Sequence, residues 1–300
     1  MRLLVSGGSG LVGTAFLSHP EAQNHEILAP RSGELNLLNF ESVLTYLEQH
    51  KPQGVVHCAG LVGGIQRNMN AQDSFLIQNV EMGINLVKAA HQVGIMRLLN
   101  LGSSCMYPRN RESALKVEDM LTGQLEPTNE GYALAKIVVQ KLCDYVGYKT
   151  LMPCNIYGPG DDFDPKRSHL VPAVIHKLHQ AKETQVPITV WGDGEARREF
   201  MYNGDLADAM WFCFKRFESL PKVVNVGQGY DYRVIDYYRM AAKVIGYTGE
   251  FQFDTSKPVG MKRKLVDSTL LNNLGWFPRH SVAEGLKLTY DHYKLKYSHD

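Results

Sequence analysis

A glycine-rich turn near the start of the chain constrains the fold more than any other feature of the sequence. The apolar run "RLLVS" at residues 2–6 leads directly into "SGGSGLVG", and a helical pattern begins near Leu11. Gly8, Gly10 and Gly13 give the spacing G-x-G-x-x-G. Between a strand and a helix, this spacing allows a tight turn, close backbone approach to a pyrophosphate, and helix amides directed at that anion. We therefore predict a dinucleotide-binding turn, with a purely structural glycine turn as the alternative.

Short apolar runs alternate with longer helical patterns through the first half of the chain, as is typical of a parallel α/β sheet. Beyond about residue 158 the pattern loosens into a polar, turn-rich stretch, which indicates a smaller second lobe. We predict an α/β fold, a Rossmann-type doubly wound parallel sheet with a smaller C-terminal substrate-binding lobe. The expected domains are residues 1–165 for the dinucleotide, with 205–230 returning to that domain, and 166–300 mainly for the substrate.

Composition limits the functional classes. The chain has 300 residues and a formal net charge of +1, from 32 basic and 31 acidic side chains. This balance gives no field that favours nucleic acid or a membrane surface, so we expect neither as a partner. The five cysteines are scattered without metal-type spacing, and we expect reduced thiols and no metal site. The N-terminal apolar run is too short for a signal peptide, and no window approaches about 18 apolar residues, so we expect a cytoplasmic protein.

The second predicted strand ends in "ILAPRSGE", which bears on the choice of cofactor. An acidic residue at this point normally binds the ribose 2′-hydroxyl of NAD, whereas an arginine accommodates the 2′-phosphate of NADP. Arg31 stands there, and Glu34 follows three residues later. The sequence therefore favours NADPH, although an arginine at a strand end is often only a solvated charge.

The stretch "EGYALAKIVVQKL" places Tyr132 and Lys136 four residues apart, on one face of a predicted helix. A lysine ammonium beside the tyrosine would lower the pKa of the phenol, which suits an acid that protonates a carbonyl. Ser103 ends the preceding strand, where open α/β sheets bind ligands, so its hydroxyl can bond the same carbonyl. An ordinary amphipathic helix is the alternative interpretation of Tyr132 and Lys136.

The glycine turn, the strand-end serine and Tyr-x-x-x-Lys together resemble the short-chain dehydrogenase/reductase superfamily. Chain length and "NVEMGINLVKAA", with Asn79 heading its helix, resemble its extended, sugar-nucleotide-modifying branch. Less generic stretches resemble the GDP-L-fucose synthase family across nearly the whole chain. These stretches are "VGGIQRN", "GSSCMYP", "LEPTNEGYALAK", "MPCNIYGPGDDFDPKRSHLVPA", "VWGDGEARREF" and "GMKRKLVDSTLLNNLGW".

The resemblance implies an NADPH-dependent enzyme that epimerises C3 and C5 of GDP-4-keto-6-deoxy-D-mannose and reduces C4. The implied reductase residues are Ser103, Tyr132 and Lys136, and the implied epimerisation pair is Cys105 and His169. The implied cofactor-binding residues are Gly7, Gly8, Gly10, Leu11, Val12, Gly13, Arg31, Ala59, Lys136, Asn155 and His169. The implied substrate-binding residues are Asn155, Lys177, Trp191, Arg198 and Lys264.

Cys105 follows Ser103 by two residues, where the chain has just left its strand, so both side chains can face one cleft. Removal of a proton beside a ketone needs a thiolate or its equivalent, and a charged imidazolium of His169 nearby would lower the pKa of the thiol. An inert buried cysteine is the alternative. Although Trp191 belongs to the substrate set, we expect it to pack within the second lobe rather than to stack on a base.

Two features depart from the family pattern. Lys177 stands where some members have a substrate-contacting arginine, so the charge is kept but the bidentate fork is lost. The connection at 143–149 is several residues shorter than the family's and leaves the local loop undetermined. Two long predicted helices, 74–92 and 131–145, resemble those that form a dimer bundle in this superfamily, so we expect a homodimer.

Two other functions stay open at this point. A reductase of a related GDP-4-keto-6-deoxysugar, or of a GDP-linked heptose or colitose, would keep the fold and the reductase residues but alter or lose the epimerase step. A catalytically silent NADP-binding regulator is the more distant alternative. The intact set of Ser103, Tyr132 and Lys136 argues against it.

Overall fold

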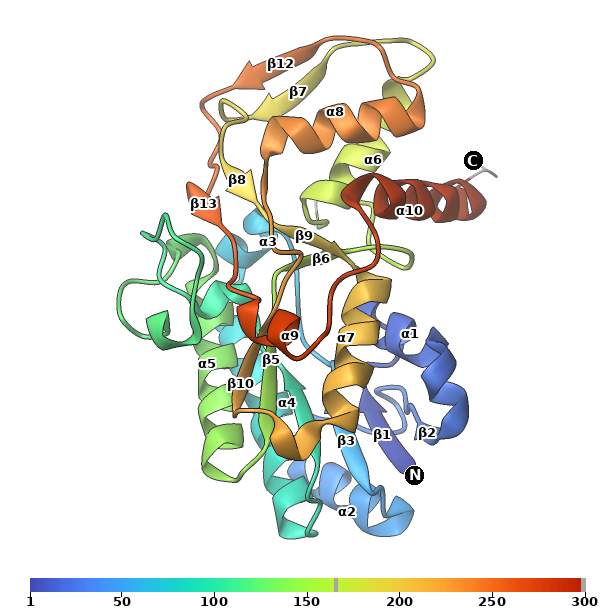
Figure 1. Ribbon diagram of the computed structural model, residues 1–300, viewed down its shortest axis with the longest axis vertical. Coiled ribbons are helices and arrows are strands. Elements are labelled where there is room, and N and C mark those ends of the chain that lie inside the picture. The colour runs from blue at the N-terminus through green and yellow to red at the C-terminus, as the bar shows by residue number, and fades with distance from the viewer. Residues whose placement is uncertain (165–166, 298–300) are drawn as a thin grey trace.

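The computed structural model describes residues 1–164 and 167–297. A six-stranded parallel sheet forms the lower half of the molecule in Figure 1. Its order is β10-β5-β4-β3-β1-β2, so the order reverses between β1 and β3, where such sheets bind ligands. The strands are β1 (Arg2–Ser6), β2 (Glu26–Leu28), β3 (Gly54–His57), β4 (Leu98–Leu101), β5 (Lys149–Pro153) and β10 (Val223–Val226).

Helices cover both faces of this sheet. Phe16 and Trp211 stack with ring centroids 4.2 Å apart and join two helices on one face. Val43, Leu86 and Val139 belong to a buried cluster between the sheet and three helices on the other face. The predicted doubly wound α/β fold is confirmed. The first pair is α1 (Leu11–Ser18) and α7 (Asn203–Lys215), and the other three are α2 (Phe40–His50), α4 (Gln72–Gln92) and α5 (Glu130–Tyr145).

The sequence explains why these layers form. Leu3, Leu4 and Val5 of β1 are all fully buried, as expected for a parallel strand that is covered on both faces. Helices α4 and α5 pack closely because Gly83 has no side chain: a Cβ there would lie 2.3 Å from Val139. This packing fixes α5, which carries Tyr132 and Lys136, against the sheet.

The second lobe has its own buried core, formed mainly by helices α6 (Leu170–Ala181), α8 (Val234–Ile245) and α10 (Val282–Tyr297). It forms the upper half of Figure 1, where β7 (Ile188–Trp191) pairs with β12 (Phe251–Asp254). Two small sheets lie between this core and the large sheet. They are β11 (Tyr232–Arg233), β8 (Arg197–Arg198) and β13 (Arg263–Lys264), and the pair β6 (Asn155–Tyr157) and β9 (Phe200–Tyr202). The exact limits predicted for the two domains stay a prediction.

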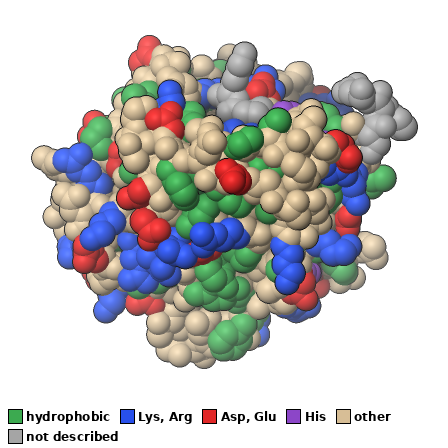
Figure 2. All heavy atoms as spheres, turned by 90° about the horizontal axis from the view of Figure 1, so that it is seen from above, with side chains coloured by type: hydrophobic (Ala, Val, Ile, Leu, Met, Phe, Trp, Pro, Cys, Tyr) green, Lys and Arg blue, Asp and Glu red, His purple; other side chains and the backbone are tan. Residues whose placement is uncertain are grey.

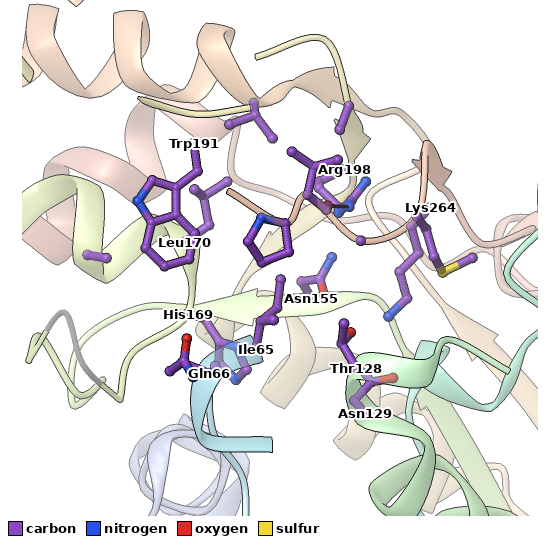
Figure 3. Close-up of a pocket in the computed structure, with 18 of the residues that line it drawn as sticks. Ile65, Gln66, Thr128, Asn129, Asn155, His169, Leu170, Trp191, Arg198 and Lys264 are labelled. Atoms are coloured by element: carbon purple, nitrogen blue, oxygen red, sulfur yellow. Dashed lines mark hydrogen bonds between the residues drawn. The ribbon is translucent and has the colours of Figure 1, made fainter. Parts of the chain in front are cut away.

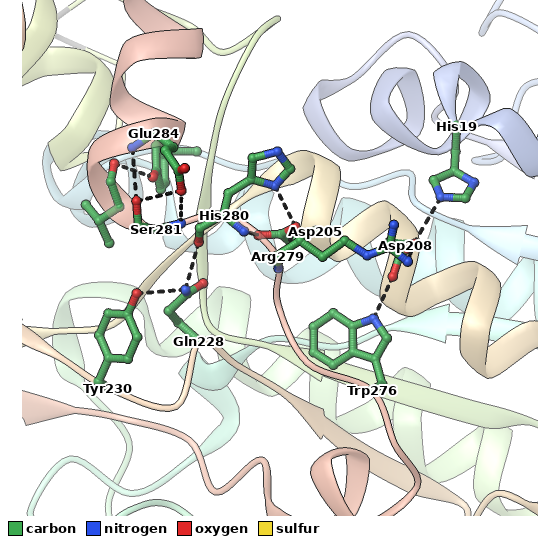
Figure 4. A network of polar contacts seen from close by, with 12 residues as sticks. His19, Asp205, Asp208, Gln228, Tyr230, Trp276, Arg279, His280, Ser281 and Glu284 are labelled. Atoms are coloured by element: carbon green, nitrogen blue, oxygen red, sulfur yellow. Dashed lines mark hydrogen bonds and ion pairs between the residues drawn. The ribbon is translucent and has the colours of Figure 1, made fainter.

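A polar network ties α7 to the chain segment that leads into α10 (Figure 4). The buried carboxylate of Asp205 accepts hydrogen bonds from the backbone N–H groups of Arg279 and His280 and contacts the His280 ring at 2.8 Å. One turn further along α7, Asp208 accepts from the Trp276 indole at 2.8 Å and pairs with Arg279 at 3.2 Å. The segment before α10 is therefore anchored to the helices of the large sheet.

The position of Asn79 and the connection after α5 can now be compared with the sequence. Asn79 lies inside α4 rather than at its head, because α4 begins at Gln72; its carboxamide instead bonds both the N–H and the C=O of Leu61. The short connection after α5 closes tightly, with Gly147 at a φ of +85° that favours glycine. Residues 146–148 therefore suffice to join α5 to β5.

Two observations concern the surface and the helices of the described chain. Figure 2 shows one face on which basic and acidic side chains lie among one another, with hydrophobic side chains between them. Within residues 1–164 and 167–297, no helix has the length and apolar character needed to span a bilayer.

Candidate active site

The glycine turn lies at the carboxyl end of β1. Gly7 has a φ of +73°, and a Cβ on it would lie 2.6 Å from the backbone of Ala59, which follows β3. A Cβ on Gly13 would lie 2.2 Å from the Gly7 carbonyl oxygen, so only glycine fits either position. Gly10, the N-cap of α1, supplies no side-chain cap, so backbone amides at this helix start are left for an anion. Gly8 lies in the same turn, and Leu11 and Val12 begin α1; a turn and helix start of this form is the kind that binds the pyrophosphate of a dinucleotide.

Arg31 is exposed just beyond the carboxyl end of β2, on the same side of the sheet as the glycine turn, which follows the carboxyl end of β1. Its backbone N–H donates to the Glu34 carboxylate at 2.8 Å. This bond ties the acidic group to the backbone of the turn. Glu34 is thus held by the loop itself, while Arg31 is exposed to solvent.

The three predicted reductase residues come together at the ends of β4 and α5. Lys136 is buried, and its Nζ donates to the carbonyl of Leu101, the last residue of β4, at 2.8 Å. The same Nζ lies 5.8 Å from the centre of the Tyr132 ring. The Ser103 hydroxyl is a further polar neighbour of the Tyr132 phenol and acts to lower its pKa. Their proximity is a structural fact, and their catalytic roles stay predictions.

The predicted lowering of the Tyr132 pKa is wrong for this structure. Burial raises the pKa of the phenol, the negative charge of Cys105 raises it further, and the Ser103 hydroxyl opposes the rise only in part. The Lys136 ammonium binds Leu101 instead, and burial lowers the pKa of this lysine to about 8. Tyr132 therefore keeps its proton at neutral pH, the form that donates a proton rather than removes one.

A cavity of about 270 Å³ lies between the lobes (Figure 3). Ser103, Tyr132 and Lys136 do not line it; they lie beyond Cys105, which does. Figure 3 places Trp191 and Lys264 at opposite ends of the cavity, with Asn155 and His169 between them. The predicted residues that line it are Cys105, Asn155, His169, Lys177, Trp191, Arg198 and Lys264.

The Cys105 thiol has three polar neighbours. Its Sγ receives hydrogen bonds from Lys264 Nζ and Asn129 Nδ2, each at 3.1 Å. The backbone N–H of Cys105 donates to Ser103 Oγ at 3.2 Å. Burial alone would raise the pKa of this thiol, but Lys264, Ser103 and Asn129 outweigh it and leave the pKa below its ordinary value. These contacts favour the thiolate, so the geometry fits a reactive cysteine better than an inert one.

His169 is the N-cap residue of α6 and faces the same cavity. The surrounding walls desolvate its ring, and this effect, with the charge of Lys264, lowers the pKa of His169. At neutral pH the imidazole is therefore mostly uncharged. The prediction that an imidazolium of His169 acts on the thiol is wrong here, because the cation beside Cys105 is Lys264.

The remaining predicted substrate residues lie on the second lobe and its connecting strands. Arg198 donates from Nη2 to the Val259 carbonyl at 2.7 Å, and Asn155 donates from Nδ2 to the Glu199 carbonyl at 2.8 Å. Trp191 is 40% exposed at the cavity wall, so the expectation that it packs inside the lobe is wrong. Lys177 Nζ lies 5.9 Å from the Trp191 ring centre, which leaves a cation beside an open aromatic face.

Comparison with known proteins decides the family. The sequence profile of the NAD dependent epimerase/dehydratase family matches residues 3–227. The chain belongs to this family. It is 47% identical to the GDP-L-colitose synthase of Yersinia pseudotuberculosis over 100% of both chains, and 45% identical to the GDP-L-fucose synthase of Azorhizobium caulinodans over 97% and 96%. The solved GDP-mannoheptose C4 reductase of Campylobacter jejuni, with NADP bound, superposes with a TM-score of 0.88 at 28% identity, covering 98% of each chain.

Within this epimerase/dehydratase chain, one residue of the site was missed from sequence. Asn129 is the N-cap residue of α5, a position where asparagine normally caps the helix. Here it makes no side-chain cap, and its carboxamide reaches Cys105. The only signal in the sequence is its place in "LEPTNEGYALAK", and ordinary capping explains that pattern equally well.

Glu199 is a second residue that sequence reasoning missed. Its fully buried carboxylate accepts from the backbone N–H groups of Gly229 and Val266, each at 2.8 Å, and burial raises its pKa to about 7. Its own N–H donates to the Lys264 carbonyl at 3.1 Å. Glu199 therefore holds in place the strands that carry Arg198 and Lys264, which are register partners in β8 and β13.

Proposed function

We propose that this chain catalyses the NADPH-dependent 3,5-epimerisation and 4-reduction of GDP-4-keto-6-deoxy-D-mannose to GDP-L-fucose. The observation that carries the proposal is the thiol of Cys105, whose sulfur accepts hydrogen bonds from Lys264 and Asn129, close to the tyrosine of a reductase set. Reduction alone needs no base of this kind. A relative named GDP-L-fucose synthase, at 45% identity, supports the same conclusion.

The residues of the first domain hold the cofactor in this proposal. The glycine turn binds the pyrophosphate, Arg31 the 2′-phosphate, and Lys136 the ribose side of the site. When bound, NADPH supplies the hydride that reduces C4. The NADP-bound reductase of similar fold supports this assignment.

Epimerisation comes first, because the 4-keto group acidifies the hydrogens at C3 and C5. Cys105 removes each proton: the C–H bond breaks, an S–H bond forms, and the electron pair moves into an enolate on O4. His169 returns a proton to the opposite face, after which Cys105 releases its proton to solvent and His169 takes one up from solvent, so both residues are reset for the second carbon. The substrate diphosphate favours the protonated imidazole, since a nearby negative charge raises the pKa of a histidine.

Reduction follows and ends the sequence, because it destroys the ketone that made epimerisation possible. Tyr132 donates its phenolic proton to O4 as the carbonyl is reduced, and Ser103 bonds the same oxygen. Arg198 and Lys177 bind the diphosphate, and Asn155 contacts the sugar side. Trp191 forms the wall at the nucleotide end of the cavity.

A second candidate function rests on the 47% identity to a GDP-L-colitose synthase. Such an enzyme accepts a related GDP-4-keto-6-deoxysugar and carries out an altered epimerisation. The deciding experiment incubates the protein with NADPH and each 4-keto sugar and identifies the product by proton NMR. GDP-L-fucose from the mannose-derived substrate supports the main proposal. Product from the colitose precursor alone supports the second. If NADPH absorbance falls with neither of the two substrates, both proposals are without support.

Arg31 provides a test of cofactor choice. Arg31→Ala removes a charge-assisted hydrogen bond, so the KM for NADPH should rise about tenfold or more while the KM for NADH changes little. Steady-state kinetics with both cofactors would measure this. Arg97→Ala is the matched control, because Arg97 immediately precedes β4, at the amino ends of the strands and away from the glycine turn, and pairs there with Glu218. Equal losses for the two cofactors would contradict the assignment.

The proposal also places the enzyme in the cytoplasm as a homodimer. The five cysteines are free thiols, which fits a reducing compartment. Ile77 on α4 is 54% exposed, and Leu134 and Val138 on α5 are 38% and 43% exposed. These apolar side chains suit a bundle with a second copy. Sedimentation of the purified protein would test the dimer.

A further inference from the structure

The sulfur of Cys105 is surrounded by hydrogen-bond donors. Lys264 Nζ, an ammonium, can only donate, and Asn129 Nδ2 also donates. A neutral thiol is a weak acceptor, whereas a thiolate accepts two charge-assisted or polar hydrogen bonds well. The geometry around Sγ therefore matches a thiolate better than a thiol.

The contact with Cys105 is the main polar interaction found for the Lys264 side chain in the described structure. This side chain is buried, and among the described residues it forms no ion pair with a carboxylate. A buried ammonium without a compensating charge is costly. A Cys105 thiolate supplies that charge, so each ion of the pair offsets the cost of burying the other.

Asn129 leads to the same conclusion independently. Its side chain makes no hydrogen bond to the first turn of α5, although it is the N-cap residue, and its Oδ1 is buried without a partner. Its amide NH₂ group instead donates to the sulfur of Cys105. The charged and titratable groups around the sulfur are Lys264 from β13, Arg198 from β8 and Tyr132 from α5; Glu126 and His169 line the same cavity.

We infer that Lys264 keeps Cys105 in its thiolate form, with Asn129 as second donor, and that Lys264 serves proton abstraction as a positioning residue rather than as a ligand of the substrate diphosphate. The part of this inference that concerns catalysis rests on the proposed function. In the abstraction step the substrate C–H bond breaks, the proton passes to sulfur, and the electron pair moves to O4. Lys264 keeps its proton throughout and loses its anionic partner until Cys105 is deprotonated again.

The test that is independent of any substrate is alkylation of the full-length protein by iodoacetamide from pH 5 to pH 10, followed by peptide mass spectrometry. Only the thiolate reacts, so the rate rises with pH to a plateau, and its midpoint is the pKa of Cys105. In the wild type this midpoint should lie below that of an ordinary thiol. Cys58 is the internal negative control: burial raises its pKa to about 12, so it should stay largely unalkylated up to pH 10.

Lys264→Gln should move the Cys105 midpoint to higher pH, since an opposite charge at this distance lowers a pKa by about 1–3 units. The alkylation rate at pH 7 should fall about tenfold or more, and Lys264→Arg should restore most of it. Lys262→Gln, two residues away and exposed, is the matched control and should leave the profile unchanged. A wild-type midpoint at or above the ordinary thiol value would overturn the inference even if Lys264→Gln fails to fold.

Kinetics separate this inference from the proposed function. With GDP-4-keto-6-deoxy-D-mannose in deuterium oxide, Lys264→Gln should slow exchange at C3 and C5 about tenfold or more and change KM little. A large rise in KM with an unchanged alkylation profile would make Lys264 a diphosphate ligand and overturn the inference. The expected alkylation profiles without exchange in the wild type would instead remove the proposed epimerase function and leave the ion pair standing.

Discussion

Replacing Tyr132 with phenylalanine should lower the rate of 4-reduction by about 10²–10⁴-fold, the range expected when a positioned acid is lost. The ring and its packing against Phe75 are retained, so the fold and NADPH binding should be preserved. The burial that keeps this phenol protonated is the physical reason for the size of the effect. The measurement is the loss of NADPH absorbance under single-turnover conditions.

The same variant should still exchange solvent deuterium into C3 and C5 of the substrate, because epimerisation requires no hydride and no proton from Tyr132. Tyr145→Phe is the matched control, since Tyr145 lies on the same helix and is 82% exposed. Exchange is followed by proton NMR. Complete absence of exchange in Tyr132→Phe, with normal cofactor binding, would mean that Tyr132 serves both steps.

Replacing Cys105 with serine should nearly abolish deuterium exchange at C3 and C5, a loss of at least about 10²-fold. A serine hydroxyl is not ionised by Lys264 and Asn129 near neutral pH, so the base is lost while the size of the side chain is kept. NADPH binding and thermal stability should stay close to wild type. The enzyme should then reduce the unepimerised ketone and release a different GDP-6-deoxysugar, which proton NMR identifies.

His169→Asn separates the two partners of epimerisation. If His169 is only the acid, its loss should impair formation of the epimerised product more than it impairs exchange. Wild-type exchange and wild-type product in Cys105→Ser would return this cysteine to an inert role. The protein would then be a plain reductase.

The first half of the molecule could be predicted from sequence because its signals are local. The glycine turn, the apolar strand at 2–6 and the spacing of Tyr132 and Lys136 each fall within a short stretch, and backbone geometry converts them directly into structure. The doubly wound sheet followed from the repetition of such stretches.

The electrostatics of the site could not be predicted in the same way. Lys264 lies 159 residues beyond Cys105 in the chain, on a two-residue strand that no periodicity reveals. The spacing of Tyr132 and Lys136 predicts the wrong direction for the Tyr132 pKa, because it says nothing of burial, nor of the Leu101 carbonyl that accepts from the lysine. The sequence around Trp191 fails for a related reason: its strand alternates, and only the fold shows that its outward side faces a cavity.

The pairing of β8 with β13 has a consequence for how such enzymes diverge. Arg198 and Lys264 are register partners in these strands, so a single small sheet carries both the side chain proposed to bind the diphosphate and the cation proposed to hold the base. A mutation that alters nucleotide recognition here would also disturb the chemistry. We expect new sugar specificities to arise instead on the opposite wall of the cavity, at Ile65, Gln66 and Thr128, where side chains can change without replacing either cation or Asn129.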